Sequence, residues 1–155
     1  MNIKPFDANL SAQYDGPARQ AVAEHCNAYL ARIGVDKEWH LGPGKKYGID
    51  LVTNNGRLGI EVEVKQAFYL ALSAGVDILE RKARKAESRF GLEDAFYWLL
   101  DKELHRAIVC TAETVAEQKP FEKKCSDRKG GHRTEVVRRI QKNSFKIVSL
   151  EHAKR

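Results

Sequence analysis

Apolar positions near the N-terminus recur at helical spacing, which is the pattern of one face of an amphipathic helix. Asp15 provides a capping residue, and Pro17 suits a first helical turn, where the backbone N–H needs no partner within the helix. Gly34 is a typical stop signal. We therefore predict a helix over residues 15–34, preceded by an irregular segment over residues 1–14. The apolar stripe comprises Ala18, Val22, Cys26, Tyr29 and Ile33.

A short strand and a second helix follow in the pattern. The strand is expected over residues 38–41, and Gly42-Pro43-Gly44 ends it. The helix is expected over residues 76–90, where Val76, Leu79, Ala83, Ala86 and Phe90 keep helical spacing. The other side of this helix is basic, which indicates either a solvated surface or a face directed at phosphates. Its cations are Arg81, Lys82, Arg84, Lys85 and Arg89.

Short apolar runs rich in aromatic and β-branched residues predict further strands. AFYWLL (95–100) and RAIVCT (106–111) are typical of two buried strands of one sheet, and FKIVSL (145–150) of a last strand. Residues 136–140 fit either a helix or a strand. The order of elements predicts a mixed α/β domain with a central sheet flanked by helices.

Between the two predicted helices, the stretch YGIDLVTNNGRLGIEVEVK (47–65) reads as a β-hairpin. Asn55-Gly56 is a strong hairpin signal, because a type I′ turn needs positive φ at both central residues. With these two residues as the loop, Val52 lies opposite Gly59 and Asp50 lies opposite Glu61. A slip of one residue would bury charge and expose the apolar set, so the pattern favours this register.

The two faces of this hairpin differ sharply in polarity, because side chains alternate along a strand. One face carries Ile49, Leu51, Leu58, Ile60, Val62 and Val64. The other carries Asp50, Glu61, Glu63 and Lys65. Like charges directly opposite one another destabilise a sheet. A divalent cation offsets such repulsion, and carboxylate oxygens with waters suit Mg²⁺ or Mn²⁺.

The segment GID followed by EVEVK resembles the active-site signature of the PD-(D/E)xK nuclease superfamily, with Gly48-Ile49 in place of the proline before the aspartate. The order of predicted elements is similar as well. The resemblance implies a restriction-endonuclease-like fold with an αβββαβ core over residues 1–155, as a single nuclease domain. It implies a divalent-metal-dependent nuclease that hydrolyses DNA phosphodiester bonds as an endonuclease.

The resemblance also assigns roles by position. Asp50, Glu63 and Lys65 would be catalytic, and Asp50, Glu63 and the backbone carbonyl of Val64 would bind Mg²⁺, with Mn²⁺ able to substitute. Lys65 would orient or deprotonate the attacking water. Cleavage would leave a 5′-phosphate, and cutting both strands of a duplex would require a homodimer. The alternatives are a catalytically inactive nucleic-acid-binding protein on the same fold, and a ribonuclease.

Three further features stay open at this stage. Glu61 is either an outer ligand or only a neighbour of the site. Glu24, on the first helix, is either a further ligand or a solvated residue on the side opposite the apolar stripe. The basic stretch KPFEKKCSDRKGGHR (119–133) either wraps a duplex or is a solvated loop.

Composition changes this picture only modestly. A chain of 155 residues with 43% hydrophobic residues is typical of one globular domain. The net charge of +6 is compatible with a nucleic-acid partner. Three cysteines without CxxC spacing argue against a disulfide framework and against a cysteine zinc site. We find neither a signal peptide nor a membrane-spanning apolar run, and we expect a cytoplasmic protein.

Overall fold

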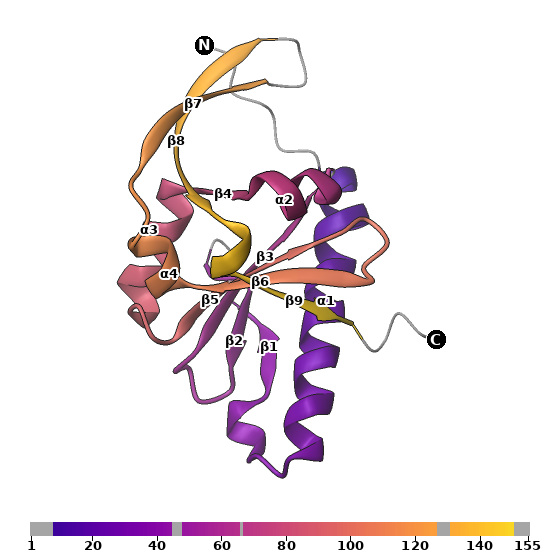
Figure 1. The fold of residues 1–155 in the computed structure, drawn as a ribbon. Helices are drawn as coiled ribbons and strands as arrows, with labels where there is room; N and C mark the ends of the chain where they lie inside the picture. The colour runs from indigo at the N-terminus through magenta and orange to yellow at the C-terminus, as the bar shows by residue number, and fades with distance from the viewer. Residues whose placement is uncertain (1–7, 45–47, 66, 127–130, 151–155) are drawn as a thin grey trace.

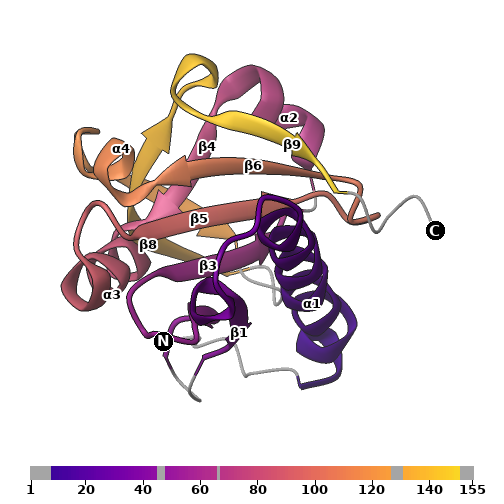
Figure 2. The ribbon, with the colours of Figure 1, turned by 90° about the horizontal axis from the view of Figure 1, so that it is seen from below.

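The computed structural model describes residues 8–44, 48–65, 67–126 and 131–150 (Figure 1). Within them, six strands form one sheet in the order β1-β2-β3-β5-β6-β9 (Figure 2). These strands are β1 (Leu41–Pro43), β2 (Leu51–Thr53), β3 (Gly59–Val64), β5 (Ala95–Leu100), β6 (Arg106–Thr111) and β9 (Lys146–Ser149). Three further strands form a second sheet in the order β4-β8-β7, namely β4 (Val76–Leu79), β7 (Phe121–Ser126) and β8 (His132–Ile140).

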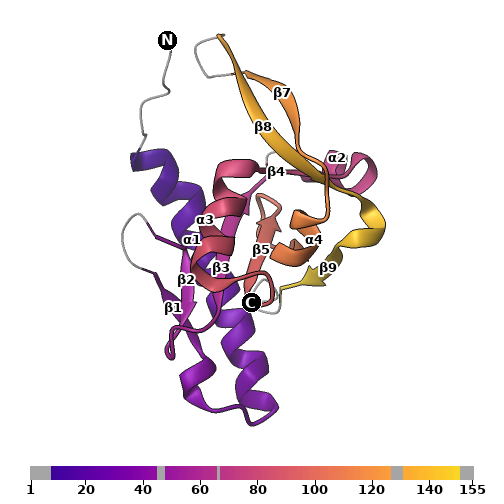
Figure 3. The same cartoon turned by 90° about the vertical axis from the view of Figure 1, so that its left-hand side faces the viewer.

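Helices cover the two faces of the six-stranded sheet unequally. The long helix α1 (Ala8–Arg32) packs on one face through Ala18, Ala21 and Val22. The other face is covered by α2 (Phe68–Ala74), α3 (Glu80–Phe90), α4 (Ala112–Ala116) and strand β4. Figure 3 shows α3 and α4 toward the viewer. Short 3₁₀ turns span Lys37–Trp39 (η1) and Lys142–Ser144 (η2).

The strand directions place the parallel pair at the centre of the large sheet. β1, β2 and β3 are antiparallel neighbours, whereas β3 and β5 run parallel. A parallel neighbour requires a crossover connection, which α2, β4 and α3 supply here. The predicted α/β domain with a mixed central sheet flanked by helices is therefore confirmed at this level.

The first helix begins earlier than predicted. It starts at Ala8, so the prediction of an irregular segment is wrong for residues 8–14, while residues 1–7 lie outside the described part. Pro17 lies inside the helix, where it removes one hydrogen bond at a cost of roughly 3 kcal/mol. Burial of the neighbouring Ala18 and Val22 against the sheet offsets this cost, because tertiary packing supplies most helical stability.

The predicted helix over residues 76–90 is two elements. Residues 76–79 form strand β4, in which the buried Val76 and Ile78 alternate with the partly exposed Asp77 and Leu79. A segment of only four residues is too short to distinguish a strand period from helical spacing, because Val76 and Leu79 are also three residues apart. The helix α3 begins only at Glu80.

A predicted loop and a segment left open by the sequence are both strands. The basic stretch over residues 119–133, predicted as a loop, forms β7 and the start of β8, an antiparallel hairpin. Residues 136–140, left open between helix and strand, also belong to β8. The strand predicted over residues 38–41 is displaced to Leu41–Pro43, because an edge strand tolerates proline.

The hairpin of β2 and β3 keeps the predicted register, with Leu51 opposite Ile60 and Val52 opposite Gly59. The predicted type I′ turn is wrong, because Gly56 has positive φ (72°) and Asn55 does not. The side chain of Asn55 instead accepts a hydrogen bond from the backbone N–H of Arg57. The turn thus has different dihedral angles but leaves the same residues facing one another.

Candidate functional site

The charged face of the β2–β3 hairpin lies on the side of the sheet that α3 covers. Glu61 and Glu63 sit beside Tyr97 and Leu99 of β5, and these two residues belong to the core on that side. Asp50 precedes β2, in a bend of the chain. Ile49, predicted on the opposite face with Leu51, is also buried on this side, because the bend interrupts the alternation of the strand.

Asp50 is held by the backbone of the neighbouring strand. The N–H of Val62 donates a 2.8 Å hydrogen bond to its Oδ2. Arg19, one residue after the buried Ala18 of α1, places its Nε 3.5 Å from Oδ1 of the same carboxylate. The carboxylate of Asp50 therefore occupies a fixed position at the start of β2, between this strand and the first helix.

Glu61 lies close enough to Asp50 for the Asp50 carboxyl to affect its ionisation. The Glu61 side chain is only 10% exposed. Burial, followed by the contact with Asp50, raises the pKa of the Glu61 carboxyl from 4.5 to about 7, although Lys85 acts in the opposite direction. The Glu61 carboxyl is therefore easier to protonate than an ordinary glutamate.

Lys85 reaches the carboxyl pair from α3. Its Nζ lies 3.1 Å from Oε1 of Glu61 and donates a 3.3 Å hydrogen bond to the carbonyl of Gly48. The contact with Glu61 is an ion pair without hydrogen-bond geometry, since Oε1 is buried and has no hydrogen-bond partner. Lys85 therefore balances part of the negative charge of this buried carboxyl.

Glu63 and Lys65 form a second, more exposed group farther along β3. The Nζ of Lys65 lies 3.4 Å from Oε1 of Glu63 and 3.4 Å from the backbone carbonyl of Asp77 in β4. The Glu63 side chain is 40% exposed and that of Lys65 is 25% exposed. Val64, whose carbonyl is a predicted ligand, packs its side chain on the α1 side of the sheet.

A narrow crevice connects the two groups. Glu61 and Glu63 both line it, together with Lys82 of α3 and Ile78 of β4. Glu61, Glu63 and Lys65 are thus brought to the α3 side of the sheet, and Asp50 lies beside Glu61 while also facing Arg19 of α1. The described contacts join Asp50 to Glu61 rather than to Glu63.

Glu24 lies away from the site, whereas Arg19 and Lys85 belong to it without having been predicted as partners of its carboxylates. Glu24 accepts a 3.1 Å hydrogen bond from Gln20 on the exposed side of α1, and no described contact joins it to the carboxyl pair. Arg19 and Lys85 were not predicted as partners of individual carboxylates. The only signal in the sequence for Lys85 was its place on the basic face of the predicted second helix. The sequence pattern gave no signal that Arg19 contacts Asp50.

Asp50 and Glu61 are the residues best suited to share a cation. Within the described residues, no three His, Cys, Asp or Glu side chains are arranged to hold a metal ion. Mg²⁺, however, is commonly bound by one or two carboxylates and completes its shell with waters and substrate phosphates. The carboxyl groups of Glu61 and Asp50, which lie beside one another, fit this kind of hard-cation site.

Comparison with protein-family models, curated proteins and solved structures finds no match to this chain. Across the described residues, none of the helices combines the length and hydropathy that crossing a bilayer requires.

Proposed function

We propose that this protein is a divalent-metal-dependent nuclease that hydrolyses DNA phosphodiester bonds as an endonuclease. The observation that carries the proposal is that the buried carboxyl of Glu61 lies beside the Asp50 carboxyl. A folded protein gains no stability from two carboxyl groups packed together, because one of them must stay protonated or find a cation. A site that binds a divalent cation explains why the chain keeps this pair.

The arrangement of elements supports the same proposal. A long helix precedes three antiparallel strands, β1 to β3, and a helical crossover then leads to β5, which is parallel to β3. This is the order that a restriction-endonuclease-like αβββαβ core has. The charged residues lie just before β2 and along β3. These are the positions of the active site in the superfamily signature that this chain resembles.

In the proposed site, Asp50 and Glu61 would hold Mg²⁺ or Mn²⁺, and Glu63 and the Val64 carbonyl are the ligands that the resemblance implies. The bound metal would lower the pKa of a water and stabilise charge on the phosphoryl oxygens. The Val62 N–H keeps Asp50 in place before any ligand arrives. Arg19 and Lys85 reduce the repulsion between the carboxylates while the site is empty of cation.

Lys65 is the residue that would act on the substrate. Its ammonium group is positioned by contacts with the Glu63 carboxylate and the Asp77 carbonyl, and the side chain remains partly exposed. From this position it can donate a hydrogen bond to a phosphoryl oxygen, whose negative charge grows in the transition state. It can equally orient the attacking water, which is the role that the resemblance implies.

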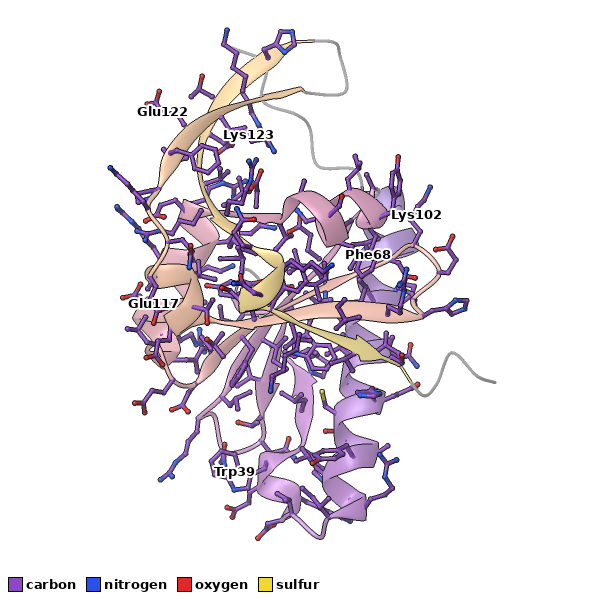
Figure 4. The ribbon with its side chains drawn as sticks, in the orientation of Figure 1. Trp39, Phe68, Lys102, Glu117, Glu122 and Lys123 are labelled. Carbon is purple, nitrogen blue, oxygen red and sulfur yellow. The ribbon has the colours of Figure 1, made fainter. Side chains whose placement is uncertain are left out.

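Replacing Lys65 tests this assignment. We expect Lys65→Ala to lose at least about a hundredfold in the rate of DNA cleavage, since one stabilising donor is typically worth that much. Binding of an uncut duplex should weaken only slightly. Lys102→Ala, in the exposed turn between β5 and β6 (Figure 4), is the matched control and should cleave normally.

Cleavage rates and duplex binding are measured for both variants with Mg²⁺ and with Mn²⁺. Full activity of Lys65→Ala would contradict the proposed role. Duplex binding by the unaltered protein without any cleavage in either metal would instead indicate a non-catalytic nucleic-acid-binding protein. Cleavage of RNA alone would indicate a ribonuclease.

A further inference from the structure

A second charged cavity adjoins the candidate site on the side of Lys65. It has a volume of about 260 Å³ and lies between α2 and the base of the β7–β8 hairpin. Its charged lining residues are Lys65, Lys123, Arg139 and Asp77. Three cations therefore surround a single carboxylate, and the cavity carries a net positive charge.

Asp77 is the centre of this cluster. Arg139 donates hydrogen bonds of 2.7 and 3.0 Å to its two carboxylate oxygens, and Lys123 forms an ion pair with Oδ2. Burial opposes ionisation of Asp77, but the hydrogen bonds from Arg139 and Lys123 outweigh it and lower the pKa of this carboxyl. Asp77 thus stays ionised and holds the two cations beside the cavity.

The excess of cations continues onto the β7–β8 hairpin. Glu135 of β8 has two arginine neighbours, with Arg133 Nε 3.3 Å from Oε1 and Arg81 Nε 4.0 Å from Oε2. Glu135 lies opposite Lys123 in the hairpin, so both belong to one face of it. Figure 4 shows Lys123 on the side turned toward the body of the molecule and Glu122 on the outer side.

We infer that this cavity and the inner face of the β7–β8 hairpin bind the phosphodiester backbone of a DNA strand. Lys65, Lys123 and Arg139 contact its phosphates next to the point of cleavage. The inference deepens the proposed nuclease function and rests on it for the identity of the partner. The hairpin extends away from the six-stranded sheet (Figures 1 and 3), so a strand that leaves the cavity continues along it.

Two features favour a phosphodiester strand over a small anion. First, cations continue beyond the Asp77 cluster to Arg133 on the hairpin, as a track of successive phosphates requires. Second, Lys65 belongs both to this cavity and to the candidate site, so the same strand passes both. Arg139 also lies over the ring of Phe121, 5.3 Å from its centroid, which limits the mobility of its guanidinium group.

Opposite charge changes in one cluster test the inference. Lys123→Gln removes a phosphate contact, so binding of a short labelled duplex should weaken several-fold. The slope of log K against log salt should fall by about 0.9, the value for one phosphate contact. Asp77→Asn removes the competing carboxylate, so the same duplex should bind several-fold more tightly. Fluorescence anisotropy in EDTA measures both variants without cleavage.

A purely structural cluster gives a different result. If the ion pairs only fasten the hairpin to β4, both variants weaken binding together or leave it unchanged, and either outcome overturns the inference. Lys123→Arg should restore the affinity of the unaltered protein. Lys37→Gln, in the exposed turn η1 at the other end of the molecule, is the matched control and should bind normally.

The experiment also separates this inference from the proposed function. Normal DNA cleavage with no effect of Lys123 or Asp77 on binding would remove the inference and leave the nuclease proposal standing. The expected changes in binding, in a protein that cuts no substrate, would keep the DNA track and remove the nuclease. Thermal denaturation of each variant checks that the fold is intact.

Discussion

At the scale of single residues, the main feature is that the fold places the buried carboxyl of Glu61 beside the partly exposed carboxyl of Asp50. Asp50 is fixed by the Val62 N–H, and Glu61 is buried beside it. Neither residue can move away, because Asp50 is tied to the backbone and Glu61 points out of the middle of a paired strand. The resulting repulsion between the two carboxylates is local, and it depends on pH because it requires Glu61 to be ionised.

Glu61→Gln should therefore stabilise the protein at high pH. Folding raises the pKa of Glu61, so the stability present below its ordinary pKa of 4.5 is lost as the pH rises through about 7. A shift of this size corresponds to on the order of 3 kcal/mol. Because glutamine does not ionise, the variant should escape that loss. Thermal denaturation across this pH range, in EDTA, compares the two proteins.

The pH dependence of the difference is decisive here. The variant should exceed the unaltered protein in melting temperature above pH 7 and approach it below pH 4.5. A difference that stays constant with pH would mean that Glu61 does not titrate as described.

Lys85→Gln should have the opposite effect, because Lys85 is the cation beside Glu61. Without it, ionised Glu61 is less stable, so the melting temperature should fall above pH 7. Lys85 is nearly half-exposed, which limits the loss to about 1 kcal/mol. Below the pKa of Glu61 the loss should disappear. Lys102→Gln controls for the removal of a surface charge, and an equal loss at all pH values would show that Lys85 acts elsewhere.

The sequence predicted the residues of the charged face better than their contacts. Alternation along a strand placed Glu61, Glu63 and Lys65 on one side. It misplaced Ile49, because the bend before β2 depends on a hydrogen bond from Val62 to the Asp50 side chain. Arg19 and Lys85 come from separate helices, so their contacts follow from tertiary packing, which no local pattern encodes.

At the scale of elements, apolar runs were predictable and charged strands were not. β5 and β6 were predicted over the residues they occupy, because long apolar runs with aromatic residues are typical of buried strands. β7 and β8 were missed in part, because an edge hairpin that faces solvent carries lysines and arginines like those of a loop. β4 was missed because four residues do not separate a period of two from helical spacing.

The first helix offers a test at this scale. Pro17 lies inside α1 and is exposed, so its ring contributes no core packing. Pro17→Ala should restore a helical hydrogen bond and raise the free energy of unfolding by roughly 1–3 kcal/mol. Denaturant unfolding measures this change. A neutral or destabilising result would fit a helix that begins at residue 15 with Pro17 in its first turn, as the sequence predicted, and would contradict a helix that begins at Ala8.

At the scale of the whole molecule, charge is distributed along one direction. The carboxyl groups of Asp50 and Glu61 lie near the start of β2, and Lys65 lies farther along β3. The cationic cavity and the β7–β8 hairpin follow on the far side of Lys65. The net charge of +6 is thus concentrated in part where a polyanion would approach a cation site. Proximity of an anionic substrate to a bound metal is what phosphodiester hydrolysis requires.

The coarse fold class could be predicted at this scale, but the second sheet could not. An order of helix, strands, helix and strands indicates a central sheet with helices on its faces. The three-stranded sheet joins β4 to strands more than forty residues later, a pairing that depends on the whole chain. A homodimer stays a prediction. Linear product from a plasmid would favour it, because paired cuts in both strands require two active sites, whereas nicked product requires only one.

The most direct test of the central claim is conversion of supercoiled plasmid DNA by the purified protein. We expect nicked or linear product with Mg²⁺ or Mn²⁺, none with EDTA, and none with Asp50→Asn in either metal. Equal conversion by Asp50→Asn, or conversion that persists in EDTA, would contradict a metal site built on the carboxyl pair of Asp50 and Glu61.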